Sequence, residues 1–383
     1  MFLDVTKKRN PELLDAAQAL HRSGKILPDT FVLDLDVIIE NAMLLKKSAD
    51  EAGIDLFYMA KQIGRNPLVA RHIVEAGIKK AVVVDFKEAR LFIEHGLAIG
   101  HAGHLVQIPV NFLDEILHAR PDYITVYSIE ALSNLEHACN EKGISQNVLI
   151  KIQEKDDEAY AGQHGGFSLS EIPHLAGIKF NSVKLSGLTT FPCFLPDGKG
   201  DFYCTNNVET LQKAKAIFRE NGVELAQLNL PSATCCKTTP LIKALGGTQG
   251  EPGHALTGTT PLHAVIDMPE RPAIVYVSEI SHHLEGNSFF YGGGYYRRGH
   301  FNKALIGDGN NIVETIVKQF PAENIDYYLE AEGRHPIGAT VLGAFRAQIF
   351  TSRSDVAVVS GIQSGRPRLE GIFDSAGNRA REL

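Results

Sequence analysis

The chain has 383 residues, of which 44% are hydrophobic and 22% are charged, and its formal net charge at pH 7 is −7. This balance is typical of a globular protein with a full hydrophobic core, and the length predicts about two or three domains. The negative charge and the lack of any run of lysines or arginines argue against a nucleic-acid-binding surface.

Membrane and secreted proteins are also excluded by the sequence. No run approaches the ~18 apolar residues that span a membrane, and no apolar segment follows the N-terminal cluster Lys7, Lys8 and Arg9. The five cysteines are odd in number and do not follow the spacing of zinc ligands. We therefore expect a protein of the reducing cytoplasm without a metal site.

The N-terminal half of the chain alternates between two kinds of segment. Residues 1–28 contain a predicted helix over residues 11–23, and from residue 29 onward short β-rich runs alternate with helical ones. Eight strands alternating with helices over about 235 residues predict a (β/α)8 TIM-type barrel. An open, doubly wound sheet is the alternative, but no Gly-x-Gly-x-x-Gly motif follows any strand. The predicted strands are 31–35, 56–60, 80–84, 104–108, 123–127, 148–152, 183–188 and 226–230.

Beyond about residue 261 the pattern changes to strand-like runs with turn residues between them and little helical periodicity. We therefore expect an N-terminal helical extension over 1–28, a barrel over 29–265 and a mostly β C-terminal domain over 266–383.

The most informative stretch is the end of the second run, where strand 56–60 leads directly into Lys61. Barrels build their active sites at strand C-termini, and a lysine held there among apolar neighbours has a lowered pKa and a usable neutral amine. Such amines form Schiff bases with aldehydes, among them pyridoxal phosphate (PLP). A lysine paired with a carboxylate on the barrel rim is the alternative. Asn66 and Pro67 then predict the start of the next helix.

A glycine-rich loop, residues 246–260, follows the eighth run and contains a single acid, Glu251. Its glycines and hydroxyl groups suit a bound anion, and barrels often bind phosphate after strands seven and eight. Ser232 and Thr234 add hydroxyl groups at the end of the eighth run. Because phosphate would repel a carboxylate, we expect Glu251 to face a cation such as a protonated pyridine nitrogen. A glycine-rich linker, with Glu251 in a surface salt bridge, is the alternative.

These residues are similar to those of the alanine racemase and group IV decarboxylase superfamily, the fold-type III PLP proteins. The resemblance implies that Lys61 binds PLP and that the run 250–258, with Gly253, His254 and Thr257, holds the phosphate and the pyridine nitrogen. Racemases have arginine where this chain has Glu251, whereas the decarboxylases share its Glu-Pro-Gly turn. The Lys-Gln-x-Gly-Arg-Asn-Pro run that begins at Lys61 resembles the YhfX-like group most closely.

The C-terminal part also resembles this superfamily. The run 291–298, Tyr-Gly-Gly-Gly-Tyr-Tyr-Arg-Arg, is similar to the racemase segment that carries the catalytic tyrosine, and Tyr291 is its match. In the family this tyrosine reaches the active site of the partner subunit. The resemblance therefore implies a homodimer with shared active sites.

The chain departs from the family at two cofactor contacts. Arg65 stands where the family has a phosphate-binding tyrosine, and its guanidinium could bind the same anion. Thr190 replaces the histidine that stacks on the racemase cofactor ring, so Thr190 is retained as a cofactor contact while the stacking group stays unassigned. His164, after the sixth run, is a further candidate contact. We interpret the other histidines of the barrel as surface or satisfied core residues: His72, His95, His101, His104 and His118.

The resemblance implies a PLP-dependent amino-acid racemase or epimerase, with Lys61 and Tyr291 moving a proton on opposite faces of the external aldimine. A PLP-dependent decarboxylase or lyase of the same fold and a non-catalytic PLP-binding protein are the alternatives. The C-terminal domain has no His-x-Cys or His-x-Asp pair, which metal-dependent members use. We expect an amino acid or amine as substrate, PLP as cofactor, and no metal, nucleic acid or membrane as partner.

Overall fold

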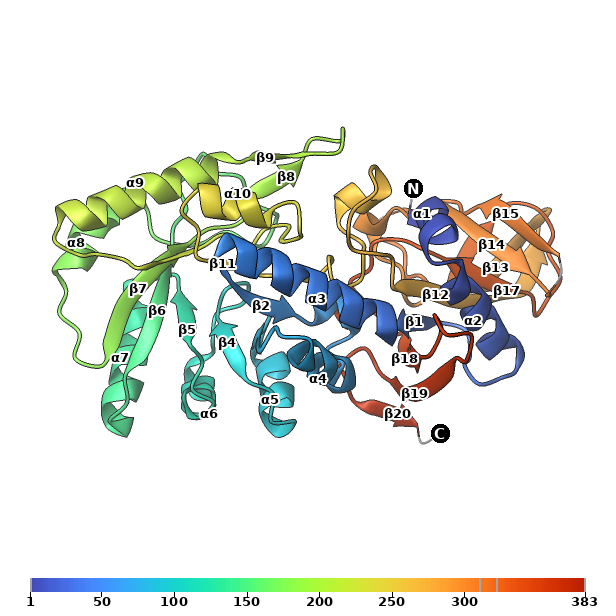
Figure 1. The fold of residues 1–383 in the computed structure, drawn as a ribbon, viewed down its shortest axis with the longest axis horizontal. Coiled ribbons are helices and arrows are strands. Elements are labelled where there is room, and N and C mark those ends of the chain that lie inside the picture. Colours follow the sequence, from blue (N-terminus) through green and yellow to red (C-terminus); the bar gives the residue numbers. More distant parts are fainter. Residues whose placement is uncertain (1, 310, 322, 382–383) are drawn as a thin grey trace. The chain divides into compact units, whose positions relative to one another are not determined.

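The computed structural model describes residues 2–309, 311–321 and 323–381. The chain divides into two compact units that are interleaved in sequence (Figure 1). The barrel unit comprises Leu44–Ala60 and Ile73–Gly253, and the sheet unit comprises Met1–Met43, Lys61–His72 and His254–Leu383.

The barrel unit contains a closed barrel of eight parallel strands, which confirms the predicted fold class. Going around the barrel, the strands are β2 (Asp55–Met59), β3 (Lys80–Val82), β4 (Ile99–Ala102), β5 (Tyr123–Val126), β6 (Gln146–Lys151), β7 (Val183–Thr189), β10 (Gln227–Asn229) and β11 (Gln249–Gly250). Because β11 pairs with β2, the last barrel strand in the sequence closes on the first.

Helices follow most of the barrel strands. Figure 1 shows α5 (Phe86–Glu94), α6 (Leu113–His118) and α7 (Ile129–Lys142) on one side of these strands, and α9 (Asn206–Glu220) and α10 (Thr239–Ala244) on the other. The remaining elements of this region are α8 (Ile172–Gly177) and the hairpin of β8 (Phe194–Pro196) and β9 (Phe202–Cys204). Two helices, α3 (Leu35–Ala52) and α4 (Pro67–Glu75), have residues in both units.

Two of the eight predicted barrel strands are wrong. Residues 31–35 fall in β1 (Thr30–Asp34), which belongs to the sheet unit, and residues 104–108 contain no strand. Their places are taken by β4, whose glycine and histidine weaken the β pattern, and by β11, which is two residues long. Such short or polar segments form strands because neighbouring strands pair with them, and their own β propensity is low. Sequence periodicity therefore does not reveal them.

The sheet unit is built on a ten-stranded sheet, and β1 lies inside it between β12 and β18. β1 runs antiparallel to β12 and parallel to β18, and all five of its residues are buried. The other strands are β12 (Ile274–Leu284), β13 (Asn287–Tyr291), β14 (Lys303–Gly307), β15 (Ile312–Ile316), β16 (Tyr328–Ala331), β17 (Thr340–Gly343), β18 (Asp355–Ser360), β19 (Arg368–Phe373) and β20 (Arg379–Arg381).

Two N-terminal helices, α1 (Phe2–Arg9) and α2 (Pro11–Arg22), pack on this sheet. Asn10 caps α2 by accepting a hydrogen bond from the Leu13 amide, and Pro11 occupies the first helical position. The apolar face of α2, including Leu13 and Leu20, joins one core cluster with β12 and β17. The predicted helix over 11–23 is therefore confirmed.

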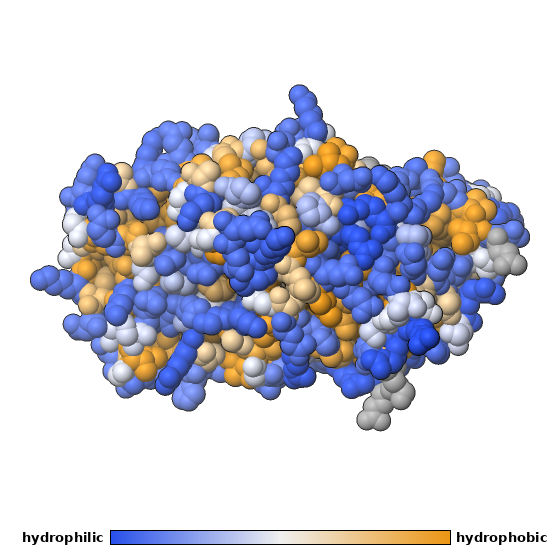
Figure 2. All heavy atoms as spheres, viewed as in Figure 1, coloured by the Kyte–Doolittle hydropathy of each residue, from blue (hydrophilic) through white to orange (hydrophobic). Residues whose placement is uncertain are grey.

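The surface combines polar and apolar residues. On the face shown in Figure 2, hydrophilic side chains are interspersed with hydrophobic ones. Within the part of the chain that the structure describes, no helix is both long enough and apolar enough to cross a membrane.

Candidate active site

Lys61 lies directly after a barrel strand. β2 ends at Met59, and Lys61 begins the short 3-10 helix η1 (Lys61–Ile63). The turn continues through Gly64, where an added Cβ would lie 2.8 Å from Val356 Cγ2, so a glycine is required there. Asn66 Oδ1 then accepts hydrogen bonds from the amides of Leu68 (3.0 Å) and Val69 (3.2 Å) and so caps α4. The spacing of this run is thus that of a strand-to-helix turn.

Arg65 follows in the same turn with a left-handed backbone conformation, at φ 55°. Its side chain is buried, and its guanidinium lies 5.1 Å from the centre of the Phe350 ring. The role of Arg65 in phosphate binding stays a prediction.

Glu251 directly follows β11, the neighbour of β2 in the barrel. Its side chain is inaccessible to solvent, and Oε1 accepts hydrogen bonds from His101 Nδ1 (2.6 Å) and Asn229 Nδ2 (3.0 Å). The alternative of a surface salt bridge is therefore wrong. Burial would raise the pKa of this carboxyl, but the imidazoles of His104 and His101 and the hydrogen bonds that Glu251 accepts outweigh burial and lower it.

The hydrogen bonds extend from Glu251 to other strand ends of the barrel. Thr189 Oγ1, on β7, donates to Asn229 Oδ1 over 2.8 Å, and Thr125 Oγ1, on β5, lies 2.6 Å from His101 Nε2. The Glu251 amide donates to Thr234 Oγ1 over 2.8 Å. Five strands therefore contribute to one buried polar cluster at the C-terminal end of the barrel, which is where barrel enzymes place their chemistry.

Some buried polar atoms of the barrel unit have no hydrogen-bond partner among the described residues. They include Glu251 Oε2 and Thr190 Oγ1, whose residues are 4% and 1% exposed. A buried polar group without a partner is costly, and natural proteins keep one mainly where a ligand completes the bonding. Glu251 Oε2 fits a cationic N–H donor such as the protonated pyridine nitrogen of PLP, and the residues present therefore fit this cofactor.

The other hydroxyl groups predicted to bind the cofactor already make hydrogen bonds within the protein. Ser232 Oγ accepts from the Cys193 amide over 2.6 Å. Thr234 Oγ1 also donates to the Pro231 carbonyl over 3.2 Å, in addition to accepting from the Glu251 amide. A hydroxyl oxygen retains acceptor capacity in such arrangements, but its only hydrogen is used when it donates. Cofactor contacts from Ser232, Thr234 and Gly253 stay predictions.

His254 and Thr257 belong to the sheet unit. His254 Nε2 accepts a hydrogen bond from Arg346 Nε over 3.0 Å, and its Nδ1 lies 3.0 Å from Thr259 Oγ1. Burial, followed by the positive charges of Arg346 and Lys61, holds the pKa of His254 well below its usual range. Thr257 Oγ1 lies 2.8 Å from Thr259 Oγ1. His254 is thus neutral and accepts a hydrogen bond from Arg346, and cofactor contacts from His254 and Thr257 stay predictions.

Tyr291 is the last residue of β13 and is half-buried. Its carbonyl oxygen accepts hydrogen bonds from Ser278 Oγ (2.7 Å) and Tyr276 Oη (3.3 Å), and its ring centre lies 5.7 Å from that of Tyr328. The Tyr291 hydroxyl makes no hydrogen bond with any described residue of the chain. Its main chain is therefore held by side chains of the sheet unit. The catalytic role of Tyr291 stays a prediction.

Sequence reasoning missed three buried residues of the barrel unit: His101, His104 and Lys151. His101 lies on β4 and binds Glu251, and the centres of the His101 and His104 rings lie 5.4 Å apart. Both are core histidines, as interpreted, but they also surround the candidate catalytic carboxylate. No signal in the sequence separates them from other buried histidines.

Lys151 ends β6 and is 3% exposed. Its Nζ donates to the Gln163 carbonyl over 3.2 Å and lies 4.4 Å from the centre of the Tyr127 ring, and burial lowers its pKa to about 8. The rule that selected Lys61, a lysine at the C-terminal end of a barrel strand, would also have found Lys151. His164, in the loop that follows, is exposed, and its cofactor contact stays a prediction.

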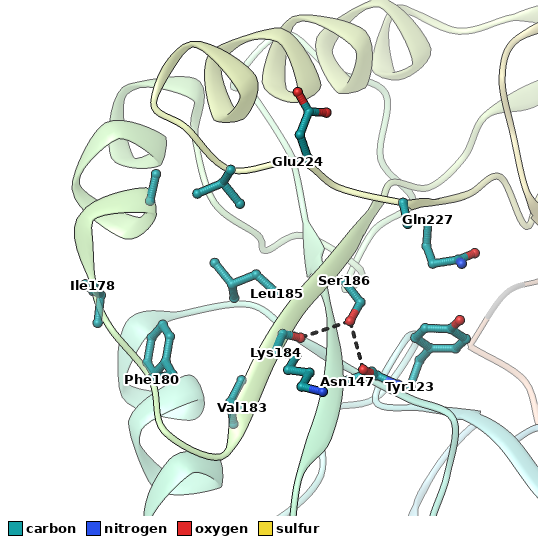
Figure 3. A pocket seen from close by; sticks show the side chains of 13 residues that line it. Tyr123, Asn147, Ile178, Phe180, Val183, Lys184, Leu185, Ser186, Glu224 and Gln227 are labelled. Atoms are coloured by element: carbon teal, nitrogen blue, oxygen red, sulfur yellow. Dashed lines mark hydrogen bonds between the residues drawn. The ribbon is translucent and has the colours of Figure 1, made fainter.

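A pocket of about 560 Å3 opens at the other end of the barrel (Figure 3). It is lined by residues at the beginnings of β5, β6, β7 and β10, including Tyr123, Asn147, Val183 and Gln227. Figure 3 shows Ser186 between Asn147 and Lys184, with hydrogen bonds to both. Because Glu251 follows the end of a parallel strand, this pocket is separate from the candidate site.

Among the residues that the structure describes, no group of three or more histidine, cysteine, aspartate or glutamate side chains is placed to hold a metal ion.

Comparison with known proteins identifies the family. Residues 33–261 match the sequence profile of the alanine racemase N-terminal domain, and residues 275–369 match that of the YhfX-like C-terminal domain. The chain is 44% identical to the uncharacterized protein YhfX of Escherichia coli (strain K12) over 383 residues, which cover 99% of both chains.

Solved structures share the fold at low sequence identity. An alanine racemase-like protein from Idiomarina loihiensis matches with a TM-score of 0.68 and 15% identity, over 92% of this chain and 99% of that one. D-threonine aldolase from Filomicrobium marinum matches with a TM-score of 0.65 and 12% identity, over 91% and 95% of the two chains. Alanine racemase from Corynebacterium glutamicum matches with a TM-score of 0.61 and 17% identity, over 83% of this chain and 92% of that one. The chain therefore belongs to the alanine racemase family, in the group that carries a YhfX-like C-terminal domain.

Proposed function

We propose that the protein is a PLP-dependent amino-acid racemase or epimerase, with Lys61 and Tyr291 as its two catalytic residues. The observation that carries the proposal is the buried Glu251 carboxylate, which has one oxygen without a partner among the described residues. Glu251 follows β11 and Lys61 follows β2, and these two strands are paired in the barrel. In this proposal, the covalent anchor and the ring-nitrogen partner each follow one of two paired barrel strands in the sequence.

In this proposal, each residue has a separate task. PLP, held covalently by Lys61 Nζ, would supply an electron sink for the α-carbon of the substrate. Lys61 Nζ, once released from the cofactor, holds or accepts a proton on one face of that carbon, and Tyr291 Oη does so on the opposite face. Glu251 binds the ring nitrogen. The rest of the cofactor is bound by the other predicted contacts: Arg65, His164, Thr190, Ser232, Thr234, Gly253, His254 and Thr257. Removal of a proton from one face and its return to the other inverts the configuration.

The cofactor and its anchor are tested together by an absorbance spectrum of the purified protein, before and after borohydride reduction. We expect a PLP band that is lost in Lys61→Ala, and a reduced pyridoxyl group on Lys61 in peptide mapping. Lys79→Ala, an exposed lysine just before β3, is the matched control and should keep the band. A label on another residue, or a colourless protein reconstituted with PLP, contradicts the proposal.

A PLP-dependent decarboxylase or lyase is the second candidate, because Glu251 replaces the racemase arginine and one structural neighbour is D-threonine aldolase. A carboxylate on the ring nitrogen keeps the ring protonated, which also supports decarboxylation and elimination. Incubation with single amino-acid enantiomers in D2O separates the two. Deuterium at Cα with inversion supports the racemase, whereas release of CO2, ammonia or an aldehyde supports the alternative. A non-catalytic PLP-binding protein would show neither.

We also propose a cytoplasmic homodimer in which Tyr291 acts in the site of the partner subunit. All five cysteines are free, as expected in a reducing compartment. The sheet unit exposes Ile312, Val313 and Ile316 on β15, an edge strand, and such edges pair readily with another chain.

A complementation experiment tests the shared sites. Lys61→Ala and Tyr291→Phe are each expected to be inactive, and their mixed dimer should regain activity because one site then contains neither change. If Lys61 and Tyr291 of the same chain formed a site, the mixed dimer would stay inactive. Sedimentation of the wild-type protein gives the oligomeric state independently.

A further inference from the structure

His101 and Glu251 form a pair that is fully enclosed in the barrel unit, with neither side chain accessible to solvent. His101 is on β4 and Glu251 follows β11, so 150 positions of sequence separate them. The bond between His101 Nδ1 and Glu251 Oε1 is 2.6 Å long, at the short limit of charge-assisted N–H···O hydrogen bonds, which are about 2.7–2.9 Å long.

Both nitrogens of the imidazole are engaged. Because an ionised carboxylate can only accept, His101 Nδ1 carries the hydrogen and donates it to Glu251. Thr125 Oγ1 lies 2.6 Å from His101 Nε2, on the other side of the ring. Rotation of the ring would break both contacts in a site without solvent, so the orientation of the imidazole is held from two sides.

The two oxygens of Glu251 are used unequally. Oε1 accepts from both His101 and Asn229, whereas Oε2 has no partner among the described residues. Because the two donors hold Oε1, the carboxylate group cannot rotate freely, and Oε2 is held in one orientation. A carboxylate arranged in this way can receive a single additional donor.

The other groups around Glu251 support an ionised carboxylate. His104, close to the His101 ring, adds to the lowering of the Glu251 pKa. Cys193 is a further titratable neighbour, and burial raises the pKa of its thiol to about 12, so that it brings no negative charge at neutral pH. Asn229 is a neutral donor.

We propose that His101 is a positioning residue, whose Nδ1–H bond keeps the Glu251 carboxylate ionised and turned so that Oε2 binds the ring nitrogen of PLP. This inference rests on the proposed function, since it assigns Glu251 to the cofactor ring. His101 itself does not touch the reacting atoms. It determines how strongly the ring nitrogen is protonated, through the carboxylate that it orients.

The test uses PLP labelled with 15N at the ring nitrogen, bound to the full-length protein and observed by NMR. His101→Leu removes the donor. His101→Asn keeps it, because Asn Nδ2 and His Nδ1 are both bonded to Cγ and so lie at the same distance along the side chain. Thr125→Val removes only the second contact of the imidazole. His174→Asn, an exposed histidine of α8, is the matched control.

In wild type, His101→Asn and the His174→Asn control, we expect the 15N signal of a protonated ring nitrogen. In His101→Leu the signal should move toward that of an unprotonated ring, with an affinity for PLP about tenfold weaker. Thr125→Val should move the signal in the same direction by less. This variant tests the inference even if His101→Leu does not fold.

Two results would overturn the inference. One is an unchanged signal in His101→Leu or, if that variant is unfolded, in Thr125→Val. The other is a His101→Asn variant that folds but behaves like His101→Leu. Borohydride mapping of the same samples separates this failure from failure of the proposed function. A labelled Lys61 with an unaffected ring signal rejects only the role of His101, whereas an unlabelled wild-type protein rejects both.

Discussion

The surroundings of Glu251 and of Tyr291 differ in how each candidate residue is held. Glu251 lies in a buried cluster in which side chains bind side chains: His101, Asn229 and, through Asn229, Thr189. Tyr291 is held through its main chain, and its side chain is half-buried. A carboxylate that must stay charged without solvent needs fixed donors. Tyr291, in the role proposed for it, would need a hydroxyl that is not already hydrogen-bonded.

The segment after Tyr291 shows how the main chain is held. The amides of Gly293 and Tyr295 donate to Asp326 Oδ2 over 3.0 and 3.2 Å. Asp29 lies beneath Gly293 and accepts hydrogen bonds from Tyr276 and Ser354. Asp326 therefore holds the backbone by hydrogen bonds, and Asp29 lies against it at Gly293. We expect substitutions in the two regions to have different effects on stability and activity.

The largest expected loss of stability follows the removal of Asn229, which bonds to Thr189, Gln249 and Glu251. Asn229→Ala leaves buried donors and acceptors unsatisfied, and we expect the free energy of unfolding to fall by about 3 kcal/mol or more. Urea denaturation measures the change. Asn147→Ala, at an exposed asparagine of β6, is the control and should change it by less than ~0.5 kcal/mol. Equal effects at both positions would contradict the buried cluster.

Asp29 should make stability depend on pH. Burial raises its pKa from 3.8 to about 6, so between these values the folded protein retains a proton that the unfolded chain has lost. The contribution of Asp29 to the free energy of unfolding is therefore largest below about pH 4. It is lost as the pH rises from about 4 to about 6, and it stays lost at higher pH. The loss amounts to about 2–3 kcal/mol. Asp29→Asn should remove this part of the pH profile in thermal denaturation. An unchanged profile would show that Asp29 titrates normally.

Gly293→Ala should disturb the Tyr291 segment by a smaller amount. An added Cβ would overlap the Asp29 carboxylate, at a backbone φ of 131° that side chains rarely adopt. We expect a loss of about 1–3 kcal/mol together with slower catalysis, because Tyr291 shifts. Gly286→Ala also has positive φ but no atom within 4 Å of the added Cβ, so the difference between the two variants isolates the overlap. Crystal structures of both variants would show whether the segment moves.

The smallest effect on stability is expected for Tyr291→Phe, because the lost hydroxyl makes no hydrogen bond with the described residues. The free energy of unfolding should change by less than ~0.5 kcal/mol, while exchange of the substrate Cα proton slows by about 100-fold or more. Tyr328→Phe, at the neighbouring ring, is the control. A Tyr291→Phe variant with full exchange activity would remove Tyr291 from the mechanism.

Much of the fold could be predicted from the sequence, because alternation of strands and helices is a short-range pattern. The barrel, the β-rich C-terminal part and the helix α2 were all predicted. Strand 31–35 was assigned to the wrong sheet, since an apolar strand fits a barrel or a mixed sheet equally well. β11 has only two residues, too few for any periodicity.

The candidate site was predicted in part. Glu251 was selected as an acid that should face a cation, and its buried, ionised carboxylate fits that reasoning. His101 was interpreted as a surface or satisfied core histidine, and the structure shows that it lies in the core. Its bond to Glu251 could not be inferred, because the order of strands around the barrel decides which side chains meet.

The sequence by itself determined which residues come at the ends of strands, Lys61 after β2 and Glu251 close before the C-terminal domain, because turn chemistry and periodicity act over a few residues. Only the tertiary structure decided that β1 leaves the barrel for the sheet and that His101 meets Glu251 across 150 positions of sequence. Such contacts depend on strand pairing and on the exclusion of water, and both are properties of the packed chain as a whole.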